Sequence, residues 1–319
     1  VNLGNSAVNI SPNGTYNGTN SVGVNSVVVG YQNKTDNNAG TLAYGANNTA
    51  YGDSAFAIGN NNKANGGNAY AMGNTSEATG TATLAFGNQA KALADYTVAV
   101  GSGAQATANN AVAVGRVNKA TNLSAVALGV NNKAEGQDST AVGSSNTVKG
   151  DQASAFGREN VIDAASVAGA TAVGYKNKAS GDRAIAIGEA NDSQVEDTIT
   201  MGHKNTASVG GGIAIGQNNV ANSGGNAGNT MIAIGRQNEA TAQDTIAIGR
   251  EAKAKNDLSV AIGNRTEATA NAAIAIGTNG APSGGNTYKT TASGFAAVAI
   301  GMQANSSGTA STAVGGKSS

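Results

Sequence analysis

Apolar and small residues recur along this chain in short runs, and each run closes on a glycine. Typical copies are Phe56-Ala57-Ile58-Gly59, Val112-Ala113-Val114-Gly115 and Ile246-Ala247-Ile248-Gly249. There are 20 such glycines, and 15 of the 19 intervals between them are 14 residues long. A lone Ala-Ile-Gly predicts nothing, but recurrence at one period is the signature of a repeat architecture.

Large and small residues alternate within each run. The residue before the glycine is large and apolar in all 20 copies, and the residue two before it is alanine in 18. A period of two predicts a short β-strand with one large-residue face and one alanine face. Asparagine stands three residues after the glycine in 12 of the 19 copies that continue. We expect it to tolerate a left-handed backbone there and to stack in ladders.

A small residue two positions after the asparagine predicts a second, thinner strand. Fourteen residues with two strands and two turns make one flat coil, and stacked coils pair their strands in parallel. Glycine in every coil and the β-branched runs oppose helix. The sequence therefore predicts an all-β fold, a narrow parallel β-roll of 14-residue coils. Residues 25–319 are expected to form one repeat domain, and residues 1–24 a cap or a degenerate first coil.

The alanine face suggests that the chain does not fold as a monomer and packs against other subunits. A strand face in solvent normally carries polar residues, so we expect the alanine face to pack on another subunit while the large residues fill the roll. The reverse assignment of the two faces is the alternative. The candidate subunit-facing residues are Ala57, Ala113, Ala186, Ala247 and Ala275.

Three of these runs resemble a known family. Asn25-Ser26-Val27-Val28-Val29-Gly30, Ser259-Val260-Ala261-Ile262-Gly263 and Ala297-Val298-Ala299-Ile300-Gly301 are similar to the Asn-Ser-Val-Ala-Ile-Gly head repeat of YadA-like trimeric autotransporter adhesins. The 14-residue spacing matches as well, over roughly residues 20–319. The resemblance implies a left-handed parallel β-roll and a homotrimer.

The same resemblance implies a place and a role. Such heads are displayed on the bacterial cell surface, held in the outer membrane by a C-terminal anchor, and take part in virulence. Their partners are host extracellular-matrix proteins, cell receptors or the surfaces of other bacteria. The family's neck, coiled-coil stalk and anchor do not occur in this sequence. We therefore expect a head segment of a longer protein, one that reaches the membrane only through segments outside it.

Charge and composition narrow the function further. Lysine and arginine number 19, as do aspartate and glutamate, and this zero balance argues against nucleic-acid binding. The chain has no cysteine and a single histidine, His203. Few residues are therefore available to form a metal site based on Cys or His, or a catalytic nucleophile paired with a general base. We expect no enzyme activity, no catalytic residues, no metal and no cofactor.

Two irregular intervals are candidate ligand-binding loops, because insertions in solenoids become loops at one corner. The alternative is that they are neutral surface loops. The candidate residues are Asn222, Asn226 and Asn229 in one interval, and Pro282, Tyr288 and Lys289 in the longest.

Lysine also recurs four residues after the closing glycine. We expect an outward column there, suited to an anionic glycan or an acidic matrix protein. The alternative is a role in solubility and in blocking sideways strand association, and Glu77, Glu239 and Glu267 interrupt the column. The candidate residues of this lysine column are Lys63, Lys91, Lys119, Lys133, Lys178 and Lys253.

The leading functional hypothesis is thus an adhesin head that attaches through many weak surface contacts. One alternative is a non-adhesive spacer of a surface fibre. Another is a glycan-degrading fibre domain, which would need clustered carboxylates and aromatic platforms that 4 Phe and 8 Tyr scarcely supply. An ice-binding solenoid would need a flat outward array of threonine, which the repeat lacks.

Overall fold

The computed structural model describes residues 8–10, 24–36, 38–222, 230–278 and 289–316. Over these ranges the chain is a parallel β-solenoid of about 19 turns with coils of about 14 residues, and they contain no helix. The all-β solenoid predicted from the period is confirmed. The chain separates into two compact units, unit 1 at Val1–Arg158 and unit 2 at Glu159–Ser319. The expected boundary after residue 24 adjoins residues outside the described ranges and stays a prediction.

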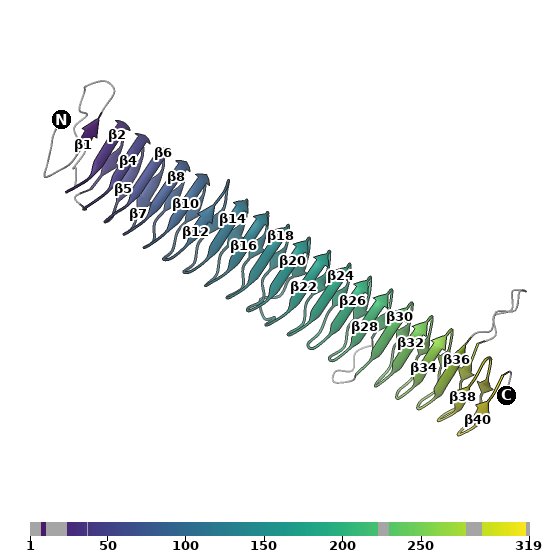
Figure 1. The fold of residues 1–319 in the computed structure, drawn as a ribbon. Helices are drawn as coiled ribbons and strands as arrows, with labels where there is room; N and C mark the ends of the chain where they lie inside the picture. Colours follow the sequence, from purple (N-terminus) through teal and green to yellow (C-terminus); the bar gives the residue numbers. More distant parts are fainter. Residues whose placement is uncertain (1–7, 11–23, 37, 223–229, 279–288, 317–319) are drawn as a thin grey trace, which may run out of the picture. The chain divides into compact units, whose positions relative to one another are not determined.

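Each coil of unit 1 contributes one long strand and one short strand, and the long strands lie side by side in chain order (Figure 1). A three-residue strand, β1 (Val8–Ile10), pairs with the first long strand. The long strands are β2 (Val27–Tyr31), β4 (Leu42–Ala46), β6 (Phe56–Asn60), β8 (Tyr70–Asn74), β10 (Leu84–Asn88), β12 (Val98–Val100), β14 (Val112–Arg116), β16 (Val126–Val130), β18 (Thr140–Ser144) and β20 (Ser154–Arg158). The short strands are β3 (Lys34–Thr35), β5 (Thr49–Tyr51), β7 (Lys63–Asn65), β9 (Glu77–Ala78), β11 (Lys91–Ala92), β13 (Gln105–Ala106), β15 (Lys119–Ala120), β17 (Lys133–Ala134) and β19 (Thr147–Val148).

Unit 2 repeats the same coil. Its long strands are β22 (Thr171–Tyr175), β24 (Ile185–Glu189), β26 (Ile199–His203), β28 (Ile213–Gln217), β30 (Ile232–Arg236), β32 (Ile246–Arg250), β34 (Val260–Asn264), β36 (Ile274–Thr278), β38 (Val298–Ile300) and β40 (Thr312–Val314). Its short strands are β21 (Val161–Ile162), β23 (Lys178–Ala179), β25 (Asp192–Ser193), β27 (Thr206–Ala207), β29 (Val220–Ala221), β31 (Glu239–Ala240), β33 (Lys253–Ala254), β35 (Glu267–Ala268), β37 (Thr291–Ala292) and β39 (Asn305–Ser306).

The strands pair in a register that stacks equivalent residues of successive coils. Ala113 lies beside Ala127 in the long strands, and Lys119 beside Lys133 in the short ones. The longer intervals do not shift this register, since β36 and β38 still pair with Ala275 beside Ala299. The ladder therefore continues across the longest interval without a change of register.

The turn after each long strand depends on two special backbone positions. Gly115 has φ +115°, and a Cβ placed there would collide with the carbonyl oxygen of Gly129 in the next coil. Only glycine suits this combination. Two residues after the glycine the backbone is left-handed, as at Val117 and Asn131, with φ 58° and 55°. The expected left-handed asparagine was therefore misplaced by one residue, since the recurrent asparagine follows this position.

The interior of the coil is lined by alanine, and this overturns the expected assignment of faces. The five alanines proposed to face another subunit are completely buried inside their own chain. They are Ala57, Ala113, Ala186, Ala247 and Ala275, each with 0% of its surface exposed. The alanines of the short strands, such as Ala120 and Ala254, are also completely buried.

The reason is the small size of the coil. Two short sheets separated by turns of a few residues lie so close that mostly methyl-sized side chains fit between them. Only a few larger apolar side chains of the described residues are fully buried. They are Val148 in unit 1, and Ile162 and Met231 in unit 2. The large residues of the long strands therefore point outward, which is the reverse of the expectation that they fill the roll.

The predicted asparagine ladder is confirmed. Asn118, Asn132 and Asn146 are completely buried at equivalent positions of three coils. The Asn132 Nδ2 donates to the carbonyl oxygen of Leu128 at 2.8 Å and to that of Gly143 at 2.8 Å. Each amide thus ties together the turn of its own coil and the next one, which satisfies buried carbonyl groups that the strands leave unpaired.

Candidate interaction surfaces

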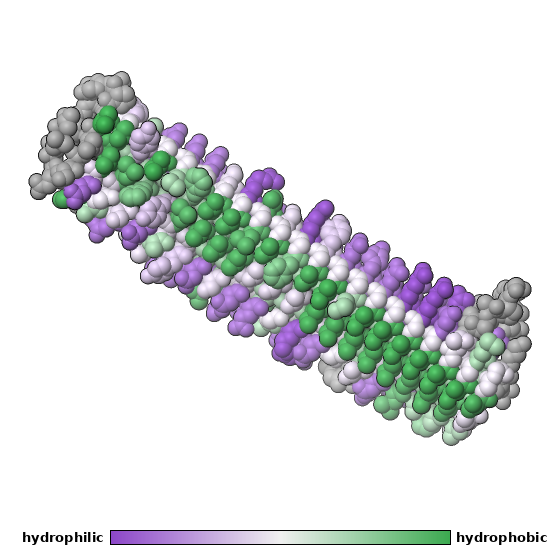
Figure 2. Space-filling view, viewed as in Figure 1, coloured by the Kyte–Doolittle hydropathy of each residue, from purple (hydrophilic) through white to green (hydrophobic). Residues whose placement is uncertain are grey.

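The outer side of the long strands forms what we call the apolar face. It consists of the residues one and three positions before each closing glycine, which flank the buried alanine. In Figure 2 the apolar residues gather in bands over the long strands. In unit 2 the face is dominated by isoleucine, and its members in four of the coils are Ile213, Ile215, Ile232, Ile234, Ile246, Ile248, Ile274 and Ile276.

The apolar face of unit 2 is only partly covered by its own chain. Most of them are half-buried by their strand neighbours, and Met201 and Ile276 expose 41% and 37% of their surface. A parallel sheet is normally covered on both faces, and a sheet face left in water usually carries polar residues. A row of exposed isoleucine is an apolar patch of the kind found at interaction surfaces.

Unit 1 carries the same face with larger and more varied residues. Tyr44 and Phe86 expose 53% and 49% of their surface. Phe56 and Tyr70 lie on paired strands, and their rings meet edge to face with centroids 5.1 Å apart. An edge-to-face pair of this kind stabilises the contact between the two coils.

The outer side of the short strands is polar and carries the lysine column. Each lysine is the first residue of its short strand, and register brings Lys119 directly beside Lys133. Lys63, Lys91, Lys133 and Lys178 are exposed, and Lys119 and Lys253 are half-buried. The structure thus places these residues in outward positions in both units, while a ligand for them stays a prediction.

Ion pairs between coils are a feature that sequence reasoning missed. The Nζ of Lys63 lies 3.3 Å from Glu77 Oε1, and the Nζ of Lys253 lies 3.1 Å from Glu239 Oε1. Each pair joins residues exactly one repeat apart, so an opposite charge 14 residues away was the available signal. The glutamates that interrupt the column therefore neutralise part of it.

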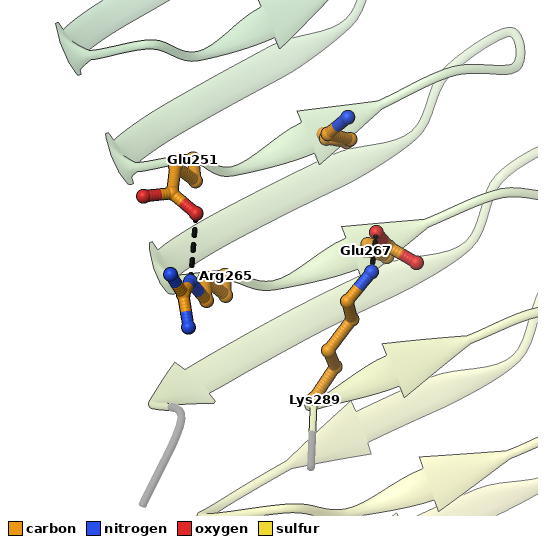
Figure 3. A pocket seen from close by; sticks show the side chains of 5 residues that line it. Glu251, Arg265, Glu267 and Lys289 are labelled. Carbon is orange, nitrogen blue, oxygen red and sulfur yellow. Dashed lines mark hydrogen bonds and ion pairs between the residues drawn. The ribbon is translucent and has the colours of Figure 1, made fainter. Parts of the chain in front are cut away.

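A shallow hollow in unit 2 is lined by five charged residues from neighbouring coils (Figure 3). Arg265 Nε lies 2.6 Å from Glu251 Oε2, and Lys289 Nζ lies 2.5 Å from Glu267 Oε1. Lys253, the fifth lining residue, pairs with Glu239 outside the hollow. The hydrogen bond from Arg265 lowers the pKa of Glu251 below the usual 4.5, and the positive charges of Arg265 and Arg250 add to this. The hollow is a mutually neutralised network, without a nucleophile and base aligned for chemistry.

Acidic and basic residues also pair at the opposite turn of unit 2. Arg183 holds Asp197 in the next coil through two hydrogen bonds, from Nε at 2.6 Å and from the terminal nitrogen at 2.8 Å. This contact lowers the pKa of the exposed Asp197 below its ordinary value. His203 lies on β26 beside Glu189 and Gln217 of the adjacent strands. In the described ranges no three histidine, cysteine or acidic residues come together to hold a metal ion.

The candidate loop residues are only partly described. Asn226, Asn229, Pro282 and Tyr288 lie outside the described residues. Asn222 follows β29, and its backbone N–H donates to the carbonyl oxygen of Ala240 at 2.9 Å. Lys289 lies in the charged hollow, so the two described members of this set, Asn222 and Lys289, occupy different coils.

Membrane contact was expected only through segments outside this sequence. Within the described residues no helix is long and apolar enough to cross a bilayer.

Comparison with known proteins assigns the repeat. The YadA head domain repeat, in its two-copy form, matches residues 37–62, 64–90, 78–104, 92–118, 120–146, 134–160, 168–188, 232–252, 254–279 and 292–318. No curated protein sequence matched the chain. The matched segments cover most of both units, and the chain belongs to the YadA head domain repeat family.

Proposed function

We propose that this chain is the head of a trimeric surface adhesin in which three left-handed β-rolls pack through their apolar faces. The apolar face is the observation that carries the proposal. Its isoleucines, such as Ile234 and Ile248, point away from a chain whose interior is already filled by alanine. Burial of these side chains between copies would remove them from water, the main driving force of association.

The size of the face fits a stable assembly. Ten coils at about 4.8 Å, with a band two side chains wide, give each unit an apolar face on the order of 500 Å². A monomer rarely exposes a contiguous apolar patch above a few hundred Å². The face of each unit is therefore more than half of the roughly 800 Å² per partner that a typical specific interface buries.

Burial of the apolar face would leave the polar short-strand sheets outermost. The lysine column and the turns on either side are then the surfaces that meet a ligand, repeated in every copy. Attachment would come from many weak contacts acting together. The ligand classes we propose are host extracellular-matrix protein, cell receptor or bacterial surface partner, without catalysis and without a cofactor.

We also propose that the head is displayed on the bacterial cell surface. Outer-membrane anchoring would be made by other segments of the same protein, as the family relationship suggests.

The test has two stages. Light scattering should give a mass about three times 31.0 kDa, and a folded protein of 31.0 kDa would contradict the trimer. The trimer is then screened against matrix proteins, glycans, epithelial cells and co-resident bacteria, beside the assembly-deficient variant Ile234→Lys/Ile248→Lys. We expect the trimer to bind and the variant to lose most of that binding, because avidity is lost.

A non-adhesive spacer is the second candidate. The ion pairs Lys63–Glu77 and Lys253–Glu239 favour it, because paired lysines have less charge left for a ligand. A trimer that binds nothing in the screen would support the spacer and contradict the adhesin.

A further inference from the structure

The apolar face of unit 1 is interrupted by hydroxyl groups in two consecutive coils. Thr140 and Ser154 occupy the position three before the closing glycine, where the preceding coils carry Val112 and Val126. They lie directly beside each other in the paired strands β18 and β20. The first long strand of unit 2 carries Thr171 at the same position.

Within the part of the chain that the structure describes, these hydroxyl groups make no hydrogen bond. Thr140 and Ser154 are half-buried, and neither side-chain oxygen has a hydrogen-bond partner among the residues that the structure describes. Buried hydroxyls elsewhere in the unit are satisfied, as Ser139 Oγ is by the carbonyl oxygen of Gly136 at 2.6 Å. The outward hydroxyls are thus available to a molecule that covers the apolar face.

A repetitive apolar face does not by itself fix the axial alignment of one copy against another. If one copy slides along another by one coil, isoleucine and valine still meet isoleucine and valine. Apolar burial is non-directional, so it discriminates weakly between the two alignments. A hydroxyl discriminates strongly, because it loses water on assembly and needs a polar partner.

We infer that Thr140 and Ser154 set the axial register of the copies, an inference that rests on the proposed trimer. When three copies are aligned, equivalent hydroxyls meet at one level and can donate to one another in a ring. A displacement by one coil sets Thr140 against Val126 of a neighbour, and its hydroxyl is left buried without a partner. A polar residue in an apolar seam fixes register in coiled coils by the same physics.

The test uses cysteine, because the chain has none of its own. Two reporter variants, Val114→Cys and Leu128→Cys, place one thiol each on adjacent coils of the apolar face. Differently tagged chains carrying one reporter or the other are assembled together and oxidised. Aligned copies form disulfides between equivalent positions, whereas copies displaced by one coil form mixed disulfides between positions 114 and 128.

We expect mixed disulfides to be rare with the parent residues at 140 and 154. In the triple variant Thr140→Val/Ser154→Val/Thr171→Val, which also removes the equivalent hydroxyl of the next repeat, their share should rise by about tenfold, the factor that corresponds to loss of one hydrogen bond. The exchanged variant Thr140→Ser/Ser154→Thr keeps both hydroxyls and should behave as the parent. A matched control, Thr147→Val on the short-strand sheet, should also leave the pattern unchanged.

The possible outcomes distinguish a failure of the register inference from a failure of the proposed trimer. Trimers whose mixed disulfides do not increase in the valine variant overturn the register inference and leave the proposed trimer intact. A trimer by mass that forms no disulfide between equivalent positions shows that another face lies between the copies, and the inference fails. A parent protein that is monomeric refutes the proposed assembly and the register inference together.

Discussion

The Oδ1 of Asn118 accepts hydrogen bonds from both the backbone N–H and the side-chain Nδ2 of Asn132, at 2.8 and 3.3 Å. The two residues are one repeat apart, and both are completely buried. The same arrangement joins Asn177 to Asn191 in unit 2, at 3.1 and 3.0 Å. The ladder is therefore a hydrogen-bonded column inside each unit, and its members depend on their neighbours in the adjacent coils.

Removing one member of the ladder should be costly. Asn132→Ala leaves the carbonyl oxygen of Gly143 and the N–H of Asn146 buried without the partners that Asn132 supplies. We expect a loss of about 2–4 kcal/mol in the free energy of unfolding, measured by denaturant titration with circular dichroism. The exposed Thr121→Ala should change it by less than about 0.5 kcal/mol. Equal effects of the two variants would show that the ladder contributes little.

Restoring a missing member should have the opposite effect. Ala252 stands where the ladder lacks an amide, although its backbone N–H still donates to Asn238 Oδ1 at 2.9 Å. In the next coil the buried Thr266 Oγ1 has no partner. Ala252→Asn supplies an acceptor for Thr266 and a donor for the carbonyl of Gly263, and should stabilise the protein by about 1 kcal/mol. Destabilisation in the same titration would show that the space is already filled.

Adjacent residues of one strand should respond in opposite ways. Ala247 is completely buried, so Ala247→Phe overfills the coil and should destroy the fold, seen as loss of the β-sheet circular dichroism signal. Ile234→Lys/Ile248→Lys changes only the apolar face, and should give a folded monomer in light scattering.

A matched control places the same charges on the other sheet. Thr206→Lys/Val220→Lys alters two outward residues of paired short strands and should assemble normally. If this control also dissociates, or if the isoleucine variant remains a trimer, the apolar face is not the contact between copies.

Acid should weaken unit 2 through Glu251. Its pKa in the folded chain is lowered by the hydrogen bond from Arg265, so its stabilising contribution is present above the ordinary value of 4.5 and is lost as pH falls through the lowered pKa. Melting temperatures measured from pH 6 down to about pH 2 should fall less steeply for Glu251→Gln. Parallel curves for parent and variant would mean that the ion pair does not contribute. Glu135→Gln, at a carboxylate of unit 1, is the control.

The predictions about the surface show what composition and spacing leave undetermined. The outward lysines follow from their place in the strand period, yet the pairing of Lys63 with Glu77 required knowing that residues one repeat apart touch. The same holds for Arg183 and Asp197. Once the coil length is known, any opposite charges 14 residues apart at these positions become candidates for ion pairs.

By itself the sequence determined the repeat, the two strands of each coil, the parallel stacking and the asparagine ladder, because these depend only on local periodicity and on like residues recurring at one spacing. The tertiary structure alone decided which face is inside. Alternation places Ala247 and Ile248 on opposite sides of a strand, but it carries no information on how close the second sheet lies. In so narrow a coil the sheets approach until mainly methyl groups fit between them, and the larger side chains remain outside for another copy to cover.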